Sequence, residues 1–133
     1  MSISSIKSLI VPNKTVEVEY PGMPGFKVSL CFLSRDTIAT IRKKSTKTVF
    51  KNRQTQEEFD EELFLKLYVE STIKGWSGLT LEYLSELLPI EMGDTDRSTP
   101  VDFSQENALS LMKNSTNFDA FITEQVTDLG NFK

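Results

Sequence analysis

The chain has 133 residues, 38% of them hydrophobic and 26% charged, which predicts a single domain over residues 1–133 with one core. It has no histidine and one cysteine, Cys31, so an intrachain disulfide, the standard zinc sites and the histidine-dependent nucleophilic triads are excluded. The net charge of −4 argues against a surface built to neutralise phosphates, and no apolar run reaches the roughly 20 residues of a membrane span.

Residues 1–33 are predicted to form an N-terminal segment and a β-hairpin. Residues 1–12 carry one late lysine and no continuous apolar stretch, so no signal peptide is predicted and we expect a cytoplasmic protein. Polar residues alternate with apolar ones from Val16 to Tyr20 and again over residues 26–32, after a Pro/Gly connection. Cys31 lies in the second run, which favours a packing role. The clustered glycines match no phosphate-binding loop, so we expect no cofactor.

From residue 34 onward the hydrophobic period changes to that of a helix. Ser34 is expected to cap a first helix that ends near residue 45. Thr55 and Glu58 form a capping-box signature for a central helix extending to about residue 74. The predicted fold class is α+β, with an N-terminal β-hairpin followed by a mainly helical part, residues 34–133, of about five helices.

Three shorter helices are predicted after the central one. Residues 75–78 interrupt the helical pattern, and Trp76 is expected to plug the core at a helix junction. Thr80 is expected to cap a leucine-rich helix. Residues 89–100 are expected to form a polar loop. This loop lacks the ligand spacing of a calcium site, so no metal is expected. The last two helices are predicted to start at Asp102 or Ser104 and at Thr116.

The middle of the chain changes abruptly from basic to acidic. The basic residues are Arg42, Lys43, Lys44, Lys47, Lys51 and Arg53, and the acidic ones are Glu57, Glu58, Asp60, Glu61 and Glu62. One interpretation is a solvated loop followed by a helix whose acidic first turn complements the macrodipole. A second is electrostatic contact between copies, made by the basic loop and the acidic helix start of the next copy. A third is nucleic-acid binding by residues 42–53, which the lack of a nucleic-acid motif argues against.

Several segments, taken in order, carry a family resemblance. They are Leu33-Ser34-Arg35, Ile41-Arg42-Lys43-Lys44, Phe59-Asp60-Glu61-Glu62-Leu63-Phe64, Gly75-Trp76-Ser77-Gly78-Leu79-Thr80, Leu87-Leu88-Pro89, Glu106-Asn107-Ala108, Leu111-Met112-Lys113-Asn114-Ser115 and Phe118-Asp119. As an ordered set over most of the chain, they resemble the tail assembly chaperones of long-tailed bacteriophages.

This resemblance implies a non-enzymatic assembly factor. It would bind the tape measure protein and keep it soluble before the tail tube protein polymerises around it. It would act in the cytoplasm of the infected host cell and be absent from the mature virion. In this family a ribosomal frameshift often appends a second domain, so a frameshift-extended form of the chain is an implied partner, and this chain resembles the short form. A homo-oligomer is also expected.

A chaperone for a helical client needs accessible apolar side chains. The candidate partner-binding residues are Leu109, Met112, Phe118 and Phe121 on the last two helices, and Phe132 near the terminus. The same helical stripes are also the pattern of ordinary core packing. The candidate electrostatic contact residues are Arg42, Lys43, Lys44 and Lys47.

Two other functions stay open from the sequence. One is a structural tail or tail-completion subunit of the virion, and the other is a small nucleic-acid-binding regulator that uses residues 42–53. An enzyme ranks last, because no pair of carboxylates is placed by its spacing in an evident pocket.

Overall fold

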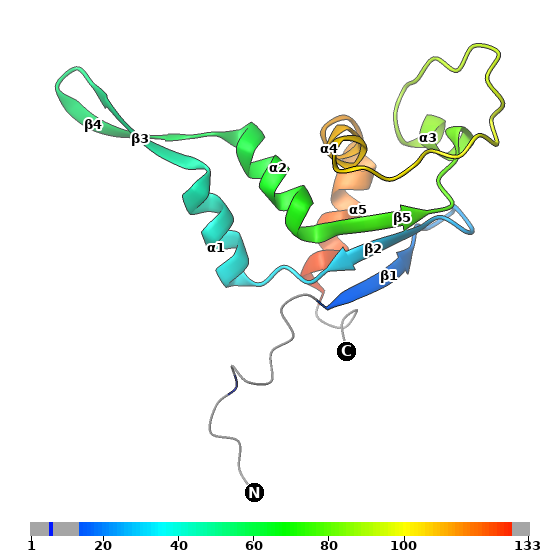
Figure 1. Ribbon diagram of the computed structural model, residues 1–133, viewed down its shortest axis with the longest axis horizontal. Coiled ribbons are helices and arrows are strands. Elements are labelled where there is room, and N and C mark those ends of the chain that lie inside the picture. Colours follow the sequence, from blue (N-terminus) through cyan, green and yellow to red (C-terminus); the bar gives the residue numbers. More distant parts are fainter. Residues whose placement is uncertain (1–5, 7–13, 129–133) are drawn as a thin grey trace, which may run out of the picture.

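The computed structural model describes residue 6 and residues 14–128 of the chain. It confirms the predicted α+β class, with an N-terminal β-hairpin and, within the described residues, five helices (Figure 1). The strands are β1 (Thr15–Glu19), β2 (Lys27–Cys31), β3 (Thr46–Lys51), β4 (Gln54–Phe59) and β5 (Ile73–Ser77). The helices are α1 (Arg35–Lys44), α2 (Glu61–Thr72), α3 (Leu81–Leu87), α4 (Gln105–Asn114) and α5 (Thr116–Thr127).

A three-stranded antiparallel sheet forms one side of the body. The strand order is β1-β2-β5, so β2 pairs with β1 on one edge and with β5 on the other. Val28 and Leu30 on the central strand are fully buried, as the alternating pattern predicts. Cys31 is 3% exposed, in agreement with its predicted packing role.

The helices cover this sheet and supply most of the core. Helices α2 and α5 contact β2, and α4 packs against both of them. Phe26, Phe118 and Ile122 are 0% exposed at the centre of the core. The ring of Tyr20 stacks on Phe26 and Phe118, with centroids 5.7 and 6.3 Å away. The end of the N-terminal hairpin and the last helix are therefore parts of one apolar cluster.

Glycine is required at one close approach of two backbone segments. Gly78 follows β5 with a φ of +80°, a conformation that L side chains rarely adopt. A Cβ atom at this position would overlap the carbonyl oxygen of Gly25 in the β1–β2 connection. The absence of a side chain lets the segment after β5 lie directly against that connection.

The predicted capping box at Thr55 and Glu58 is wrong. Both residues lie in β4, which pairs residue by residue with β3. Helix α2 begins later, and its N-cap is Asp60, whose Oδ1 accepts a hydrogen bond from the amide of Leu63 at 3.0 Å. The capping signal does not form a helix here because β3, which contains Thr46, Thr48, Val49 and Phe50, favours a strand and is joined to β4 by a two-residue turn.

The end of the central helix also differs from the prediction. Helix α2 stops at Thr72 because Ile73 starts β5, where it pairs with Leu30 of β2. Trp76 is therefore in a strand, opposite Val28, and does not plug a junction between two helices. Pairing with the distant strand β2 determines the conformation of β5. The residues of β5 show no alternation of apolar and polar side chains that would predict a strand.

Most predicted caps agree with the structure. Ser34 and Thr80 cap α1 and α3 as expected, and Ser104 is the cap of α4. The last helix begins at Thr116, as predicted, and Ser115 is its N-cap. The side chain of Ser115 is 1% exposed, so this cap is part of the core as well as the end of a helix.

The segment predicted as a solvated loop is an ordered hairpin. We call β3, β4 and their turn, residues 46–59, the arm; it projects away from the body between α1 and α2 (Figure 1). Its turn residues Asn52 and Arg53 both have positive φ, 51° and 64°, as a two-residue hairpin turn requires. At its base the amide of Asp60 donates to the carbonyl of Ser45 at 2.8 Å. The two ends of the arm are thus held side by side.

Candidate functional site

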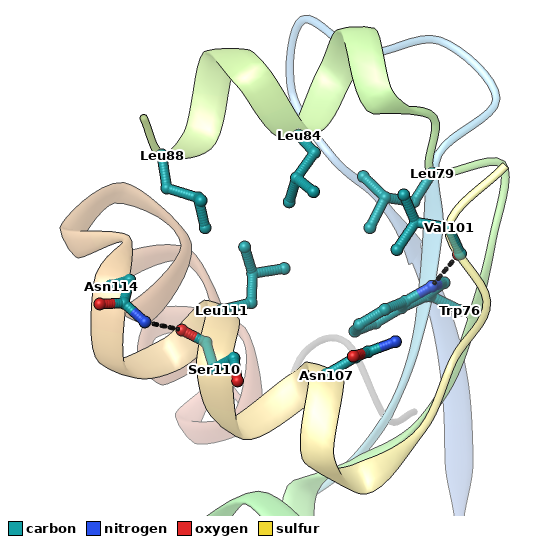
Figure 2. A pocket seen from close by; sticks show the side chains of 9 residues that line it. All are labelled: Trp76, Leu79, Leu84, Leu88, Val101, Asn107, Ser110, Leu111 and Asn114. Atoms are coloured by element: carbon teal, nitrogen blue, oxygen red, sulfur yellow. Dashed lines mark hydrogen bonds between the residues drawn. The ribbon is translucent and has the colours of Figure 1, made fainter. Parts of the chain in front are cut away.

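An apolar pocket lies between α3 and α4 and is the candidate functional site. Figure 2 shows side chains from four parts of the chain directed into the same space. The volume of the cavity is about 140 Å³. The apolar lining residues are Trp76, Leu79, Leu84, Leu88, Val101 and Leu111, and the polar ones are Asn107, Ser110 and Asn114.

Helix α3 supplies the wall of the pocket opposite α4. The hydroxyl of Thr80 caps this helix by accepting from the amide of Tyr83 at 3.3 Å. Leu84 and Leu88 are four residues apart, so both side chains lie on the face that meets the pocket (Figure 2). Both are partly buried and packed against the main core, so they are ordered without being covered.

The back of the pocket is held by hydrogen bonds to the segment before α4. The indole N–H of Trp76 donates to the carbonyl of Val101 at 2.9 Å (Figure 2). The amide of Val101 donates in turn to the carbonyl of Leu79 at 2.8 Å. The ring of Phe103 makes an edge contact with Trp76, with centroids 5.1 Å apart. These contacts fix the tryptophan, so the cavity is preformed and does not depend on a ligand to shape it.

The α4 side of the pocket is polar but carries no charge. Asn107, Ser110 and Asn114 are exposed and follow one face of the helix. The side-chain amide of Asn114 donates to the carbonyl of Ser110 at 2.8 Å, and that of Asn107 donates to the carbonyl of Asp102 at 2.9 Å. Since no residue lining the pocket is ionisable, the pocket can bind an apolar group beside a polar rim but offers no acid or base to a reaction.

The size of the cavity limits what it can hold. An apolar cavity of about 150 Å³ can stay dry and accept a molecule of the size of benzene. At about 140 Å³, this pocket matches a single leucine, methionine or phenylalanine side chain. It is therefore suited to one anchor residue of a partner.

Three of the predicted partner-binding residues on the last two helices are buried in the core. Met112, Phe118 and Phe121 are 4%, 0% and 8% exposed, and the ring of Tyr20 lies 4.6 Å from that of Phe121. Buried side chains offer no area to a partner, so for these three the structure supports the alternative of ordinary core. Leu109 is partly buried and lines a separate hollow between α2 and α4. Phe132 lies outside the described residues.

The predicted basic residues are exposed but lie away from the pocket lining. Arg42, Lys43 and Lys44 form the last turn of α1, where cations complement the helix dipole. Lys47 follows on β3 of the arm. Arg42 also borders a hollow at the base of the arm, beside Phe59. These residues are thus grouped at and near the base of the arm.

The sequence predicts the leucine-rich helix α3 but not the pocket. Leu84 and Leu88 follow the helical period, and the helical pattern is interrupted at Trp76. The pocket also requires the segment that carries Val101 to return to Leu79, with an isolated bridge between Thr80 and Pro100. The polar 89–100 loop that makes this return has no periodic signal of its own.

Shifted pKa values occur elsewhere in the body. Burial raises the pKa of Tyr68, and the charge of Asp119 adds to this, while a hydrogen bond to Thr123 opposes it. Burial also raises the pKa of Tyr20, and hydrogen bonds from the backbone and hydroxyl of Ser98 lower that of Asp96. None of these groups lines the pocket.

Two further searches of the described residues gave negative results. No group of three or more His, Cys, Asp or Glu side chains in that part of the chain is arranged to hold a metal ion. No helix among the same residues has the length and apolar character needed to cross a membrane.

A comparison with protein families identifies the family of the chain. The family described as YdaY prophage protein matches residues 33–133, which include the arm and every residue that lines the pocket. Comparisons with curated proteins and with solved structures find no match. Because the matched segment is well over half of the chain, the chain belongs to the YdaY prophage protein family and is a phage-derived protein.

Proposed function

We propose that this protein is a non-enzymatic tail assembly chaperone that binds the tape measure protein of its phage. In this role it keeps that protein soluble and helps to recruit the tail tube protein. Two observations support the proposal: the ordered resemblance to tail assembly chaperones, and membership of a prophage family. The expected place of action is the host cytoplasm, before the virion is complete, with a frameshift-extended form of the chain as a second component.

The pocket between α3 and α4 is the observation that carries the binding role. A helical client presents apolar side chains on one face, and recognition of such a face needs an apolar recess with a polar border. The recess here is formed by Leu84, Leu88 and Leu111, and the border by the polar residues of α4. When one apolar side chain of the client enters the recess, the polar residues beside it on the client helix would lie near Asn107, Ser110 and Asn114.

The strength of one such contact favours many copies on a long client. Burial of one leucine or phenylalanine side chain contributes about 1.5–3 kcal/mol, which on its own gives only weak binding. When several copies of the chaperone are linked along one client, each further contact becomes effectively intramolecular and the total affinity rises steeply. A long helical protein with repeated apolar faces is a client of this kind.

Co-expression with the tape measure protein tests this proposal. The wild-type chain is expected to be recovered with the tape measure protein and to increase its soluble fraction. Leu88→Asn places an amide at the mouth of the pocket, and capture should fall by about tenfold or more because an apolar contact is lost. Glu86→Gln alters an exposed residue of the same helix that is not part of the pocket lining, and should leave capture unchanged.

The outcomes separate the alternatives. If Leu88→Asn folds, as judged by circular dichroism, and captures the client as well as the wild type does, the pocket is not the binding site. If the wild type fails to capture or solubilise the tape measure protein, even with the extended form present, the chaperone proposal is wrong. Copies in purified virions would then favour a structural tail subunit.

A further inference from the structure

The arm exposes apolar and backbone surface that its own two strands cannot cover. Within the described residues, β3 and β4 pair only with each other. Every residue of β4 is exposed, and the side chains of Phe50 and Phe59 are 74% and 48% exposed. A two-stranded ribbon is marginally stable alone in water, and unpaired strand edges are templates for further pairing. Each edge of the arm can therefore pair with a further strand.

The two strands of the arm carry opposite charges. Lys47 and Lys51 lie on β3, and Glu57 and Glu58 lie on β4. The register places Lys47 directly opposite Glu58, and Lys51 Nζ is 2.6 Å from Glu58 Oε1. One outer edge of the ribbon is consequently basic and the other acidic.

This charge pattern distinguishes between the ways in which two arms can meet. A twofold contact of β4 with β4 would bring glutamates beside glutamates, and a contact of β3 with β3 would bring lysines beside lysines. Like charges directly opposite each other destabilise a strand pair. Pairing of β3 with β4 of another copy repeats the attraction already present inside the arm and keeps the sheet antiparallel.

We propose that the arm joins copies of this chain head to tail, with β3 of one copy beside β4 of the next. A contact between two different surfaces does not close at a dimer but continues into a ring or a filament. The added strand pairs with the free backbone groups of β3 and reduces the exposure of the Phe50 side chain. Each contact is short, so association is weak and depends on concentration.

Such a row of copies would also present a row of pockets. This consequence rests on the proposed function, because it supposes that the pockets bind a client. The proposed interface does not rest on that function, because it is inferred from the charges and open edges of the arm. Experiments on self-association without the tape measure protein therefore test the arm alone, and their failure would leave the chaperone proposal standing.

Sedimentation velocity on the full chain is the first test. The mean mass is expected to rise above that of one chain as concentration increases. It should fall when salt is raised from about 0.05 M to about 0.5 M, because the screening length shortens to a few ångströms. A single monomeric species at every concentration in low salt would overturn the proposal.

A charge-swapped arm provides the specific test. The variant Lys47→Glu, Lys51→Glu, Glu57→Lys, Glu58→Lys keeps the net charge and the attraction within the arm. It should associate with itself to the same extent as the wild type, because every β3–β4 contact again joins opposite charges. Mixed β3–β4 contacts would join like charges, so wild-type and variant chains should not alternate in one head-to-tail row. Loss of self-association in the folded variant would show that the arm charges do not direct assembly.

Removal of the arm gives an independent check. The Ser45 carbonyl and the Asp60 amide are joined at 2.8 Å, so a short glycine linker can replace residues 46–59. The shortened chain should keep the circular dichroism of the helical body and stay monomeric. If it associates as strongly as the full chain does, the interface lies elsewhere.

Discussion

The pocket is held from behind by the rest of the protein, whereas the arm is held almost entirely by its own two strands. Trp76 is fixed by a hydrogen bond and a ring contact, and Leu79 and Leu111 are 1% and 2% exposed. Between the two strands of the arm, Lys51 and Glu58 form an ion pair, and their side chains are 59% and 49% exposed. At the base of the arm, the ring of Phe59 lies 5.4 Å from that of Phe64. Exposed ion pairs contribute little to stability.

This difference separates two kinds of binding surface. A preformed pocket loses little conformational entropy when a ligand enters, so its burial energy is available for affinity. A marginal ribbon gains order when a partner strand is added, so its association is weaker and more easily reversed. This difference supports our two proposals, that the body binds the client and that the arm joins copies of the chain.

The largest expected effect comes from opening the core beneath the helices. Phe118→Ala should lower the free energy of unfolding by about 3–5 kcal/mol, because it leaves a cavity at a fully buried site. Phe50→Ala on the arm should change it by less than about 0.5 kcal/mol. Chemical denaturation of both variants measures the contrast, and similar values for the two would contradict it. Met112→Asp should also lower the free energy of unfolding strongly, because it places a charge in the core, so this variant reports on folding and not on client binding.

A smaller effect is expected at the contact between β5 and the β1–β2 connection. Gly78→Ala should cost about 1–3 kcal/mol, because its φ of +80° is strained for alanine and the new Cβ overlaps the Gly25 carbonyl. Gly75→Ala is the matched control, since a Cβ there would lie 4.0 Å from Ser29 Oγ, an ordinary contact. Equal melting temperatures for the two variants would show that the close approach is absent.

The turn of the arm should respond in the opposite direction. Arg53 has a φ of 64°, which costs energy for a residue with a Cβ, and Arg53→Gly should stabilise the arm by up to about 1 kcal/mol. Hydrogen exchange of the β3 and β4 amides should slow, while exchange in the body stays the same. Asn52→Gly is the control and should have less effect, because asparagine tolerates positive φ. Unchanged arm exchange in Arg53→Gly would mean that the turn does not limit the arm.

The smallest effect is a pH dependence within the body. Burial raises the pKa of Tyr68 above its ordinary value near 10, so the folded state holds the phenolic proton more tightly than the unfolded state does. The corresponding stability is fully present below about pH 10 and is lost as pH rises through the folded pKa. Tyr68→Phe should flatten the decline in unfolding free energy above that pH. If the wild type and variant curves fall in parallel, Tyr68 is not responsible.

The sequence predicts what local patterns determine. The alternation around Val28 and the caps at Ser34 and Thr80 each depend on residues within one turn or strand, and the structure agrees with them. Strand β5 is not predicted because its partner is distant in the sequence: Ile73 pairs with Leu30 of β2. The arm is a local hairpin, but Thr55 and Glu58 also satisfy a helix-start rule, and their pairing with Phe50 and Lys47 decides their conformation. The candidate pocket likewise depends on the return of Val101 to Leu79, which no spacing in the sequence indicates.

The most direct test of the account is methyl NMR of the leucine and valine side chains while helical peptides from the tape measure protein are added. We expect the signals of Leu84, Leu88, Val101 and Leu111 to shift together and saturate, because these side chains line the pocket. We also expect Leu88→Asn to abolish the shifts. Saturable shifts confined to other parts of the molecule, or no shifts with any peptide from that protein, would contradict the claim that the pocket binds a helical client.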